Sequence, residues 1–300
     1  APVAAAVAAS LPAARAADEG LAEVVVTATK REQTLQDVPV AVTVTTADTL
    51  QKAEIHDILD LQTIVPSLRV TQLQTSTQTN FLIRGFGNGA NNPGIESSVG
   101  VFIDGVYRSR SASQIGDLVN VERVEVLRGP QSTLFGQNAS AGVISVTTKK
   151  PSFTPTGSIE IGAGEYDWKS VKGYYSGPLS EGVAFSVTAG ANSRDGYFTN
   201  LANGSHINDR NRVDLGAQLL LNATDNLSVR LIGDFERIDE KCCGVVNLLN
   251  GPTGAVIKGI GGNLYTGPYA DRKAYLNGDP TNLVRNSGLS MHVDWKLGAT

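Results

Sequence analysis

The sequence predicts an α+β domain followed by antiparallel β-strands that cross a membrane. Two observations lead to this prediction. Up to about residue 151, short apolar runs alternate with Gly-rich turns and two helical patterns. After Pro155 the chain changes to segments of roughly ten residues in which apolar and polar side chains alternate, and this alternation is typical of transmembrane β-strands.

The composition excludes a nucleic-acid partner. The net charge is -4, and no Lys/Arg cluster is longer than Lys149-Lys150, so the electrostatic footprint of a nucleic-acid-binding protein is missing. The 32 Gly and abundant Val, Thr, Ser and Asn favour many strands joined by turns over a helical bundle.

Residues 1–16 are typical of the end of an export signal. Ala1–Leu11 is apolar but too short to span a bilayer as a helix, and Ala14 and Ala16 suit a signal-peptidase site. We therefore expect the mature chain to begin at Ala17. Since no later segment has roughly 20 consecutive apolar residues, the exported protein is expected to be either soluble or a membrane β-barrel.

A β-branched run stands in polar surroundings near the start of the mature chain. Such a strand, without an obvious partner, invites pairing with another chain. The alternative is a first strand of the following sheet, which is weaker because Lys30–Asp37 is interpreted as a linker. The run consists of Glu23, Val24, Val25, Val26, Thr27, Ala28 and Thr29.

The α+β domain is expected to begin with a strand over Val38–Val44, after which Thr46 caps a helix containing Leu50 and Ala53. A second helix is expected because apolar residues recur at helical spacing before Pro66. These residues are Ile58, Leu61, Ile64 and Val65. The remaining strands are expected at Asn80–Ile83, Val99–Ile103, Val121–Leu127 and Gly142–Thr148.

The alternating segments predict a lipid-facing stripe on one side of a sheet and a polar lumen on the other. The last segment is the clearest, because Leu289, Met291, Val293, Trp295 and Leu297 alternate with Ser290, His292, Asp294 and Lys296. The same pattern occurs in Val183–Gly190, Leu215–Leu221 and Leu227–Glu236. A soluble β-sandwich also alternates. Connection lengths favour the barrel, because Asn222–Asn226 is a short turn and Asp239–Asn286 is interpreted as a long loop.

Four ordered motifs resemble the signatures of TonB-dependent receptor plug domains: Ile83–Gly87, Val101–Tyr107, Val121–Gly136 and Asn138–Lys149. Glu23–Thr29 is similar to the TonB box of that family. The resemblance implies a plugged barrel of about 22 strands. This chain has only about six such strands, so we expect an N-terminal fragment with an incomplete barrel.

The resemblance also divides the chain. It implies a signal remnant over 1–16, a TonB box segment and linker over 17–34, a plug domain over 35–151, and the first barrel strands over 156–300.

The implied function is TonB-dependent active transport of a scarce ligand, most often a ferric siderophore, across the bacterial outer membrane. The implied partners are TonB, which would pair with the box by β-augmentation from the periplasm, its inner-membrane energising complex, the ligand and outer-membrane lipid. Other nutrients, such as a glycan or cobalamin, remain open. From another class, an exported β-rich binding protein or adhesin remains open too.

Several residues are candidates for these tasks. In the family, plug arginines such as Arg84 and Arg128 resemble members of an ion-pair cluster with barrel carboxylates, and the alternative is a solvated turn arginine. Two polar loops are candidates to face the ligand, although a simple solvated loop is equally compatible. Their residues are Gly87, Asn88, Asn91, Asn92, Tyr107, Arg108 and Arg110. Five glycines are instead expected in turns with positive φ: Gly85, Gly105, Gly129, Gly136 and Gly142.

Cys242 and Cys243 are interpreted as a possible disulfide, either with each other or with partners further along the protein. No metal site is expected from two cysteines without a nearby His. His56, His206 and His292 are scattered, so we expect neither a zinc site nor a Ser-His-Asp arrangement. The sequence thus predicts no cofactor and no enzymatic activity.

Overall fold

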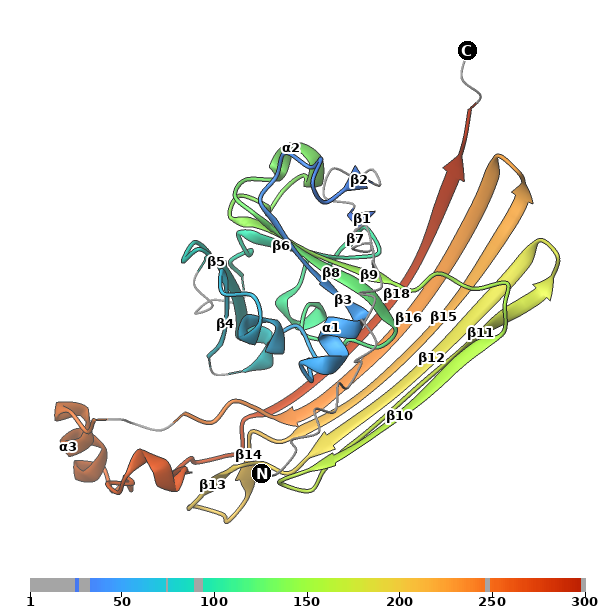
Figure 1. The fold of residues 1–300 in the computed structure, drawn as a ribbon. Helices are drawn as coiled ribbons and strands as arrows, with labels where there is room; N and C mark the ends of the chain where they lie inside the picture. The colour runs from blue at the N-terminus through green and yellow to red at the C-terminus, as the bar shows by residue number, and fades with distance from the viewer. Residues whose placement is uncertain (1–24, 27–32, 74, 89–93, 246–248, 298–300) are drawn as a thin grey trace, which may run out of the picture.

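The computed structural model describes residues 25–26, 33–73, 75–88, 94–245 and 249–297. In it, an N-terminal α+β domain lies on the concave side of a large curved sheet (Figure 1). We call this sheet the strand wall; it consists of the six strands described below.

The N-terminal domain is built on a five-stranded sheet in the order β3-β8-β9-β6-β7. All neighbouring pairs are antiparallel except β6 and β9. The strands are β3 (Val42–Thr46), β8 (Val121–Arg128), β9 (Gly142–Thr148), β6 (Val99–Ile103) and β7 (Val106–Tyr107). The predicted positions of β6, β8 and β9 are confirmed, whereas the first strand begins four residues later than predicted, at Val42 instead of Val38.

Helix α1 (Ala47–Lys52) has the predicted N-cap, because the Thr49 amide donates to Thr46 Oγ1 at 3.4 Å. The predicted second helix is wrong: only the 3₁₀ turn η1 (Asp60–Thr63) forms there. Asp57 Oδ1 accepts from the Asp60 amide at 3.0 Å, and Asp60 Oδ2 accepts from the His56 amide at 3.0 Å. Such local bonds compete with helix formation.

The remaining elements of the domain are short. β4 (Leu68–Gln72) and β5 (Thr79–Ile83) form an antiparallel hairpin around the turn η2 (Ser76–Gln78). The turn η3 (Ser111–Ser113) and helix α2 (Ser132–Phe135) complete the domain.

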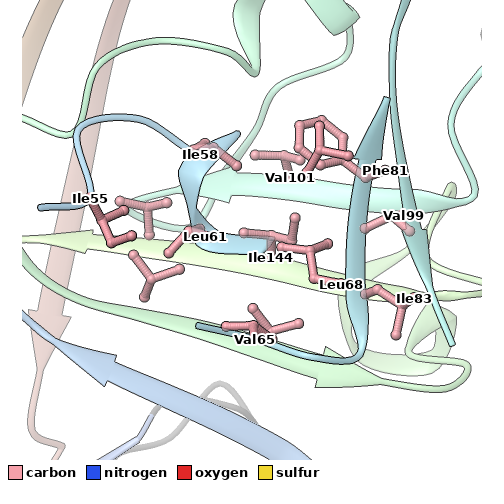
Figure 2. Packing of buried hydrophobic residues seen from close by; sticks show 14 of the residues in the cluster. Ile55, Ile58, Leu61, Val65, Leu68, Phe81, Ile83, Val99, Val101 and Ile144 are labelled. Carbon is pink, nitrogen blue, oxygen red and sulfur yellow. The ribbon is translucent and has the colours of Figure 1, made fainter. Parts of the chain in front are cut away.

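The domain has two apolar cores. The larger joins the sheet to the β4-β5 hairpin and the η1 turn (Figure 2). Its members include Ile58, Leu61, Val65, Leu68, Phe81, Ile83, Val99, Val101 and Ile144, all nearly inaccessible to solvent. Of the residues expected on the second helix, Ile58, Leu61 and Val65 are buried and Ile64 is partly buried, although only Leu61 lies in the 3₁₀ turn η1.

The smaller core lies on the other face of the sheet and includes Phe102, Leu127 and Val143. Val26 is fully buried in it. Val26 belongs to β1 (Val25–Val26), which pairs with β2 (Gln33–Thr34) in a two-stranded antiparallel sheet.

The strand wall is antiparallel throughout, in the order β10-β11-β12-β15-β16-β18. Its strands are β10 (Thr156–Gly164), β11 (Trp168–Ser180), β12 (Val183–Arg194), β15 (Arg210–Thr224), β16 (Leu227–Lys241) and β18 (Thr281–Trp295).

The register confirms the predicted alternation. Leu219 on β15 pairs with Phe185 on β12 and with Leu231 on β16, so the apolar residues share one face. On β18, Leu289 is 86% exposed and Trp295 is 66% exposed on that same outward face. The intervening polar residues face the N-terminal domain.

The connections differ in length at the two ends of the wall. The predicted turn between β15 and β16 is short, since the strands end at Thr224 and resume at Leu227. The predicted loop Asp239–Asn286 is too long, because β16 continues to Lys241 and β18 begins at Thr281, so residues 242–280 form the loop. Cross-strand bonds that continue the ladder explain the difference.

Loop 242–280 carries α3 (Pro252–Gly259), the turn η4 (Tyr269–Asp271) and β17 (Lys273–Ala274). β17 pairs with β13 (Phe198–Asn200), which also pairs with β14 (His206–Ile207). Within the described ranges, no helix is both long and apolar enough to cross a membrane.

Candidate functional site

The candidate site is the buried polar interface between the N-terminal domain and the strand wall. At its centre, Arg212 of β15 is only 2% exposed. Its Nη1 donates to Asp57 Oδ2 at 3.0 Å, to Asp117 Oδ1 at 2.9 Å and to the Ile115 carbonyl at 3.0 Å. Its Nε donates to Glu240 Oε1 of the neighbouring strand at 2.6 Å. One guanidinium from the wall thus holds two carboxylates of the domain.

Asp57 is fully buried and receives a second guanidinium, because Arg210 Nη2 lies 3.0 Å from Asp57 Oδ2. Burial raises the pKa of the Asp57 carboxyl above its ordinary value, while Arg210 and Arg212 act in the opposite direction. A buried carboxylate of this kind is stable only with its cations in place. The contact therefore depends on the wall.

Two further ion pairs cross the interface; in one the arginine belongs to the domain, and in the other it belongs to the wall. Arg108 of the domain binds Asp234 of β16 through two hydrogen bonds, 2.9 Å and 3.2 Å long. Arg230 of β16 donates to Asp104 of the domain at 3.2 Å. These charged residues of β16 lie on the inward face because their spacing is even.

The interface also contains open space. A cavity of about 190 Å³ lies between the domain and β12, β15, β16 and β18, with Asp117, Asn120, Asp214 and Glu236 among its lining residues. Gly116 leaves room for Glu236, because a Cβ at position 116 would collide with Glu236 Oε1. The contact thus combines polar groups and a cavity with one small apolar cluster, in which Ile115 of the domain packs against Ile238 and Val284 of the wall.

The arginines predicted for plug-barrel ion pairs have other surroundings in this structure. Arg128 Nε donates to the Ala41 carbonyl at 3.3 Å, and this bond joins two segments of the domain. Arg84 is exposed and has φ +53°. Neither contacts a carboxylate of the described wall strands. Their pairing with barrel residues stays a prediction for strands that this chain does not span.

The sequence did not predict which residues form these ion pairs. Arg108 was expected in a ligand-facing loop, but its guanidinium is bound to Asp234. The available signal was the run of charged residues at alternate positions on the polar faces of β15 and β16, including Arg212, Asp234 and Glu236. Because their partners are far away in sequence, the alternation indicates that this face makes polar contacts but does not identify the partner residues.

The other residues predicted to contact the ligand do not share one environment in the structure. Tyr107 packs against the smaller core, and its hydroxyl accepts from Asn138 Nδ2 at 2.8 Å. Arg110 and Asn88 are exposed, and Gly87 is half-buried. Asn91 and Asn92 lie outside the described residues. A ligand-contact role for these residues stays a prediction.

The predicted TonB box is described only at Val25 and Val26, so Glu23, Val24, Thr27, Ala28 and Thr29 lie outside the described residues. The five glycines expected in turns all have positive φ, from +73° at Gly105 to +155° at Gly142. Gly85, Gly105 and Gly129 lie in turns beside strands, whereas Gly136 ends helix α2 and Gly142 is the first residue of β9.

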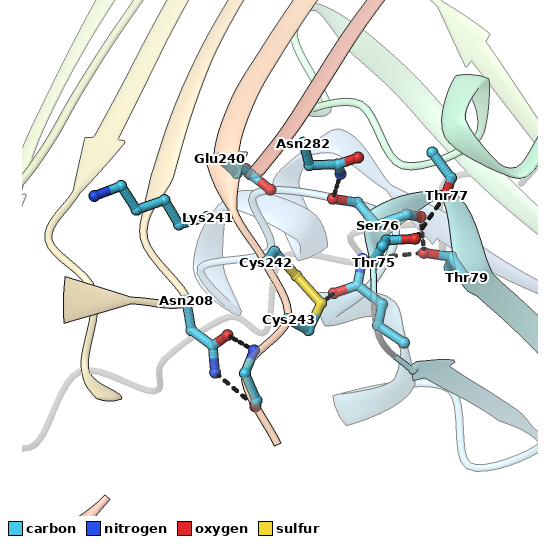
Figure 3. The surroundings of a disulfide bond; sticks show 12 residues. Thr75, Ser76, Thr77, Thr79, Asn208, Glu240, Lys241, Cys242, Cys243 and Asn282 are labelled. Carbon is cyan, nitrogen blue, oxygen red and sulfur yellow. Dashed lines mark hydrogen bonds between the residues drawn. A yellow bond between two sulfur atoms is a disulfide. The ribbon is translucent and has the colours of Figure 1, made fainter. Parts of the chain in front are cut away.

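Cys242 and Cys243 are joined to each other by a disulfide, the first of the two predicted alternatives. The pair follows β16 and lies beside the residues that precede β5 (Figure 3). Cys243 Sγ is 3.9 Å from Gln72 Oε1, and Asn282 of β18 donates to Ser76 Oγ nearby. The base of loop 242–280 therefore contacts the N-terminal domain.

No group of three His, Cys, Asp or Glu side chains in the described ranges is arranged to hold a metal ion. His56 of the domain instead packs against Trp168 of β11, with ring centroids 5.1 Å apart. The interface thus resembles a docking contact held by charge pairs.

Comparison with known proteins identifies this arrangement. Residues 34–143 match the model of the TonB-dependent Receptor Plug Domain. The chain is 33% identical over 190 residues to the Pesticin receptor of Yersinia pestis, a match that covers 62% of this chain and 28% of the relative. Residues 34–143 are a TonB-dependent receptor plug domain, and the chain has the fold of the N-terminal part of such receptors. The N-terminal domain is its plug, and the strand wall is part of its outer-membrane barrel.

Further relatives and solved structures are receptors too. The Ferrioxamine B receptor of Salmonella typhimurium is 26% identical over 199 residues, which is 61% of this chain and 27% of the relative. The structure of the ferric yersiniabactin uptake receptor FyuA from Yersinia pestis superposes with a TM-score of 0.70 at 26% identity, covering 85% of this chain and 38% of FyuA.

The ferripyoverdine receptor of Pseudomonas aeruginosa, at 20% identity and a TM-score of 0.69, shows the same fold; the match covers 89% of this chain and 34% of that one. The chain spans about 28% of the length of the first curated relatives.

Proposed function

We propose that this chain is the plug and part of the barrel of a receptor that imports a ferric siderophore across the bacterial outer membrane, driven by TonB. The observation that carries the proposal is the polar docking of the plug on the wall through Arg212, which binds Asp57 and Asp117 of the plug. A plug held mainly by charge pairs around a cavity of about 190 Å³ would break, among the described residues, only one small apolar cluster on separating from the wall, that of Ile115 with Ile238 and Val284.

The ligand class rests on the relatives. Their names include a ferric yersiniabactin uptake receptor and a Ferrioxamine B receptor, both of which concern iron chelates. One relative favours a second candidate: the Vitamin B12 transporter BtuB of Vibrio vulnificus is 28% identical over 179 residues, which is 58% of this chain and 28% of BtuB. Cobalamin is therefore the alternative cargo.

We assign the binding of TonB to the segment 23–29. Strand β1 has two residues and pairs only with the two residues of β2 in the described part of the chain, so few main-chain bonds hold it to the plug. TonB would add a strand to this segment from the periplasm, and main-chain hydrogen bonds would provide the affinity. Because Val26 is buried in the smaller core, tension on the segment would act directly on the plug.

The proposal includes the division of the chain: an export signal over 1–16, the TonB box segment over 17–34, the plug over 35–151 and barrel strands from 156 onward. TonB acts with its inner-membrane energising complex as the energy source. We propose no enzymatic step and no resident cofactor for this chain.

The test uses the intact receptor in a strain that lacks the native gene. Growth and radioactive iron uptake are measured on defined iron chelates, with cyanocobalamin as the alternative cargo. Val25→Pro removes a main-chain donor from the segment, so it should abolish uptake and leave ligand binding to whole cells unchanged. Val25→Ile is the matched control and should transport normally.

Normal uptake by the Val25→Pro variant would contradict the TonB assignment. Uptake of cobalamin and of no iron chelate would contradict the siderophore assignment while leaving the TonB assignment in place.

A further inference from the structure

Two carboxylates of the strand wall face the plug without a cation. Asp214 of β15 and Glu236 of β16 are register partners on the inward face, and both line the cavity of about 190 Å³. Asp214 Oδ2 and Glu236 Oε1 are inaccessible to solvent and accept no hydrogen bond from the described residues. The other oxygen of Glu236 accepts from Asn286 Nδ2 at 2.6 Å. Most buried polar atoms in proteins are hydrogen-bonded, so this pair is an exception within the docking contact.

The cations around this pair are bound to other carboxylates. Arg108 of the plug is bound to Asp234, and Arg212 of β15 is shared by two carboxylates of the plug and one of β16. On β11, Lys172 lies 3.9 Å from Glu160. Like charges directly opposite each other in a sheet destabilise it. The register pair on β15 and β16 therefore keeps a negative charge that no ion pair among the described residues neutralises.

The docked plug keeps water away from the pair. Glu236 Oε1 lies against the backbone of Gly116, where a Cβ would collide with it. On β12 the register partner of Asp214 is Gly190, and a Cβ there would lie 3.0 Å from Cγ2 of Val119. A methyl group of the plug thus occupies the space next to the Asp214 side chain. Withdrawal of a carboxylate from water without a cation costs free energy, and this cost disappears when water returns.

We propose that Asp214 and Glu236 form a release element, a repulsive pair that opposes docking and keeps the plug detachable. Arg212 and Arg108 attract the plug to the wall, whereas the release element offsets part of this attraction. Because water reaches both carboxylates once the plug separates, the pair lowers the free energy needed for undocking. The role of the release element in uptake rests on the proposed TonB-driven transport, whereas its effect on docking does not.

The test is hydrogen exchange of the plug amides at residues 113–119 in the intact receptor. Asp214→Asn keeps the shape of the side chain and removes its charge. Protection should rise by about fivefold or more, because both the repulsion and the burial of one unpaired carboxylate disappear. A residue that merely supported the interface would lower the protection when replaced.

Asp234→Asn is the matched control. It also removes one carboxylate from the inward face of a neighbouring strand, but this carboxylate is bound to Arg108, so protection should fall. Glu236→Gln should raise protection as Asp214→Asn does. The double variant of Asp214 and Glu236 should gain less than the product of the two single effects, because either substitution alone removes the mutual repulsion.

An uptake measurement separates this proposal from the proposed function. Asp214→Asn should slow uptake of the iron chelate that supports growth of the wild type, and should leave binding of that chelate to whole cells unchanged. Wild-type uptake rates in this variant would overturn the role of the release element in transport. A wild-type receptor that imports no chelate would contradict the proposed function, and the exchange comparison would still decide the effect on docking. Unchanged or reduced plug protection in Asp214→Asn, or an equal rise in Asp234→Asn, would overturn the proposal.

Discussion

Replacement of Arg212 by Leu should weaken the docking of the plug on the wall. Arg212 makes hydrogen bonds to Asp57, Asp117, Glu240 and the Ile115 carbonyl, and it is 2% exposed. Without it, Glu240 has no other cation within hydrogen-bonding distance among the described residues. The arginine is therefore the shared counter-ion of three buried carboxylates.

The expected cost follows from what remains in place. Asp57 keeps Arg210 at 3.0 Å, and Asp117 keeps the hydrogen bond from Asn192 at 2.7 Å. Removal of one partner from a buried ion pair costs about 3–5 kcal/mol. Since Asp57 and Asp117 retain partners, we expect the lower end, about 3 kcal/mol. This corresponds to roughly a hundredfold rise in the population of the undocked plug.

The assay is hydrogen exchange of the plug amides in the intact receptor, read at residues 55–60 and 113–119. Protection there should fall by about two orders of magnitude in the Arg212→Leu variant. Arg237→Leu is the matched control, because it removes an exposed arginine from the opposite face of the neighbouring strand. Its effect on plug protection should be negligible.

A second variant tests the cause. Arg212→Leu combined with Glu240→Leu replaces the strongest orphaned charge with an apolar side chain and should recover part of the lost protection. Plug protection that stays within twofold of the wild type in the single variant would refute the assignment of Arg212 as the docking residue.

Three other predictions concern single positions. Hydrogen bonds from Ser205, Asn203 and Lys241 hold the pKa of Asp279 below its usual range. The charged carboxylate of Asp279 therefore stabilises the folded loop 242–280 fully above the ordinary aspartate pKa of about 3.9, and this stabilisation is lost as pH falls through the lower pKa of the folded state. Hydrogen exchange of the loop amides should show this loss at acid pH in the wild type and not in the Asp279→Asn variant. Gly142→Ala should destabilise the plug by roughly 1–3 kcal/mol, because Gly142 has φ +155° and a Cβ would collide with the Leu127 carbonyl; thermal unfolding that matches the wild type would contradict this. Leu219→Arg should impair folding into lipid vesicles by about 2–4 kcal/mol, because Leu219 is on the outward face; heat-modified gel mobility measures the folded fraction.

The wall was predictable from the sequence because a period of two determines the face of every residue on a strand. Leu215 and Leu219 face outward, and Asp234 faces inward, as the alternation indicates. The Thr46 cap was also predictable, because capping is a local hydrogen bond.

The docking contact was less predictable. Arg212 and Asp57 are 155 residues apart, and no local pattern relates them. The failed helix has a local reason: Asp57 and Asp60 bond to nearby amides, and this effect outweighs the apolar spacing. Arg84 and Arg128 were chosen by family resemblance, whereas the contacts with the described strands come from Arg108, Arg212 and Arg230.

The central structural claim is that one face of the strand wall contacts lipid and the other contacts the plug. The two tryptophans of this chain test it, because Trp295 is 66% exposed on the outward face and Trp168 faces inward, with Nε1 bonded to Asn192 at 2.9 Å. The intact receptor is placed in vesicles with brominated acyl chains, and each Trp→Phe variant isolates one contribution to the fluorescence. Strong quenching of Trp295 and little quenching of Trp168 is the predicted result. Equal protection of both tryptophans from the brominated lipid would contradict the account.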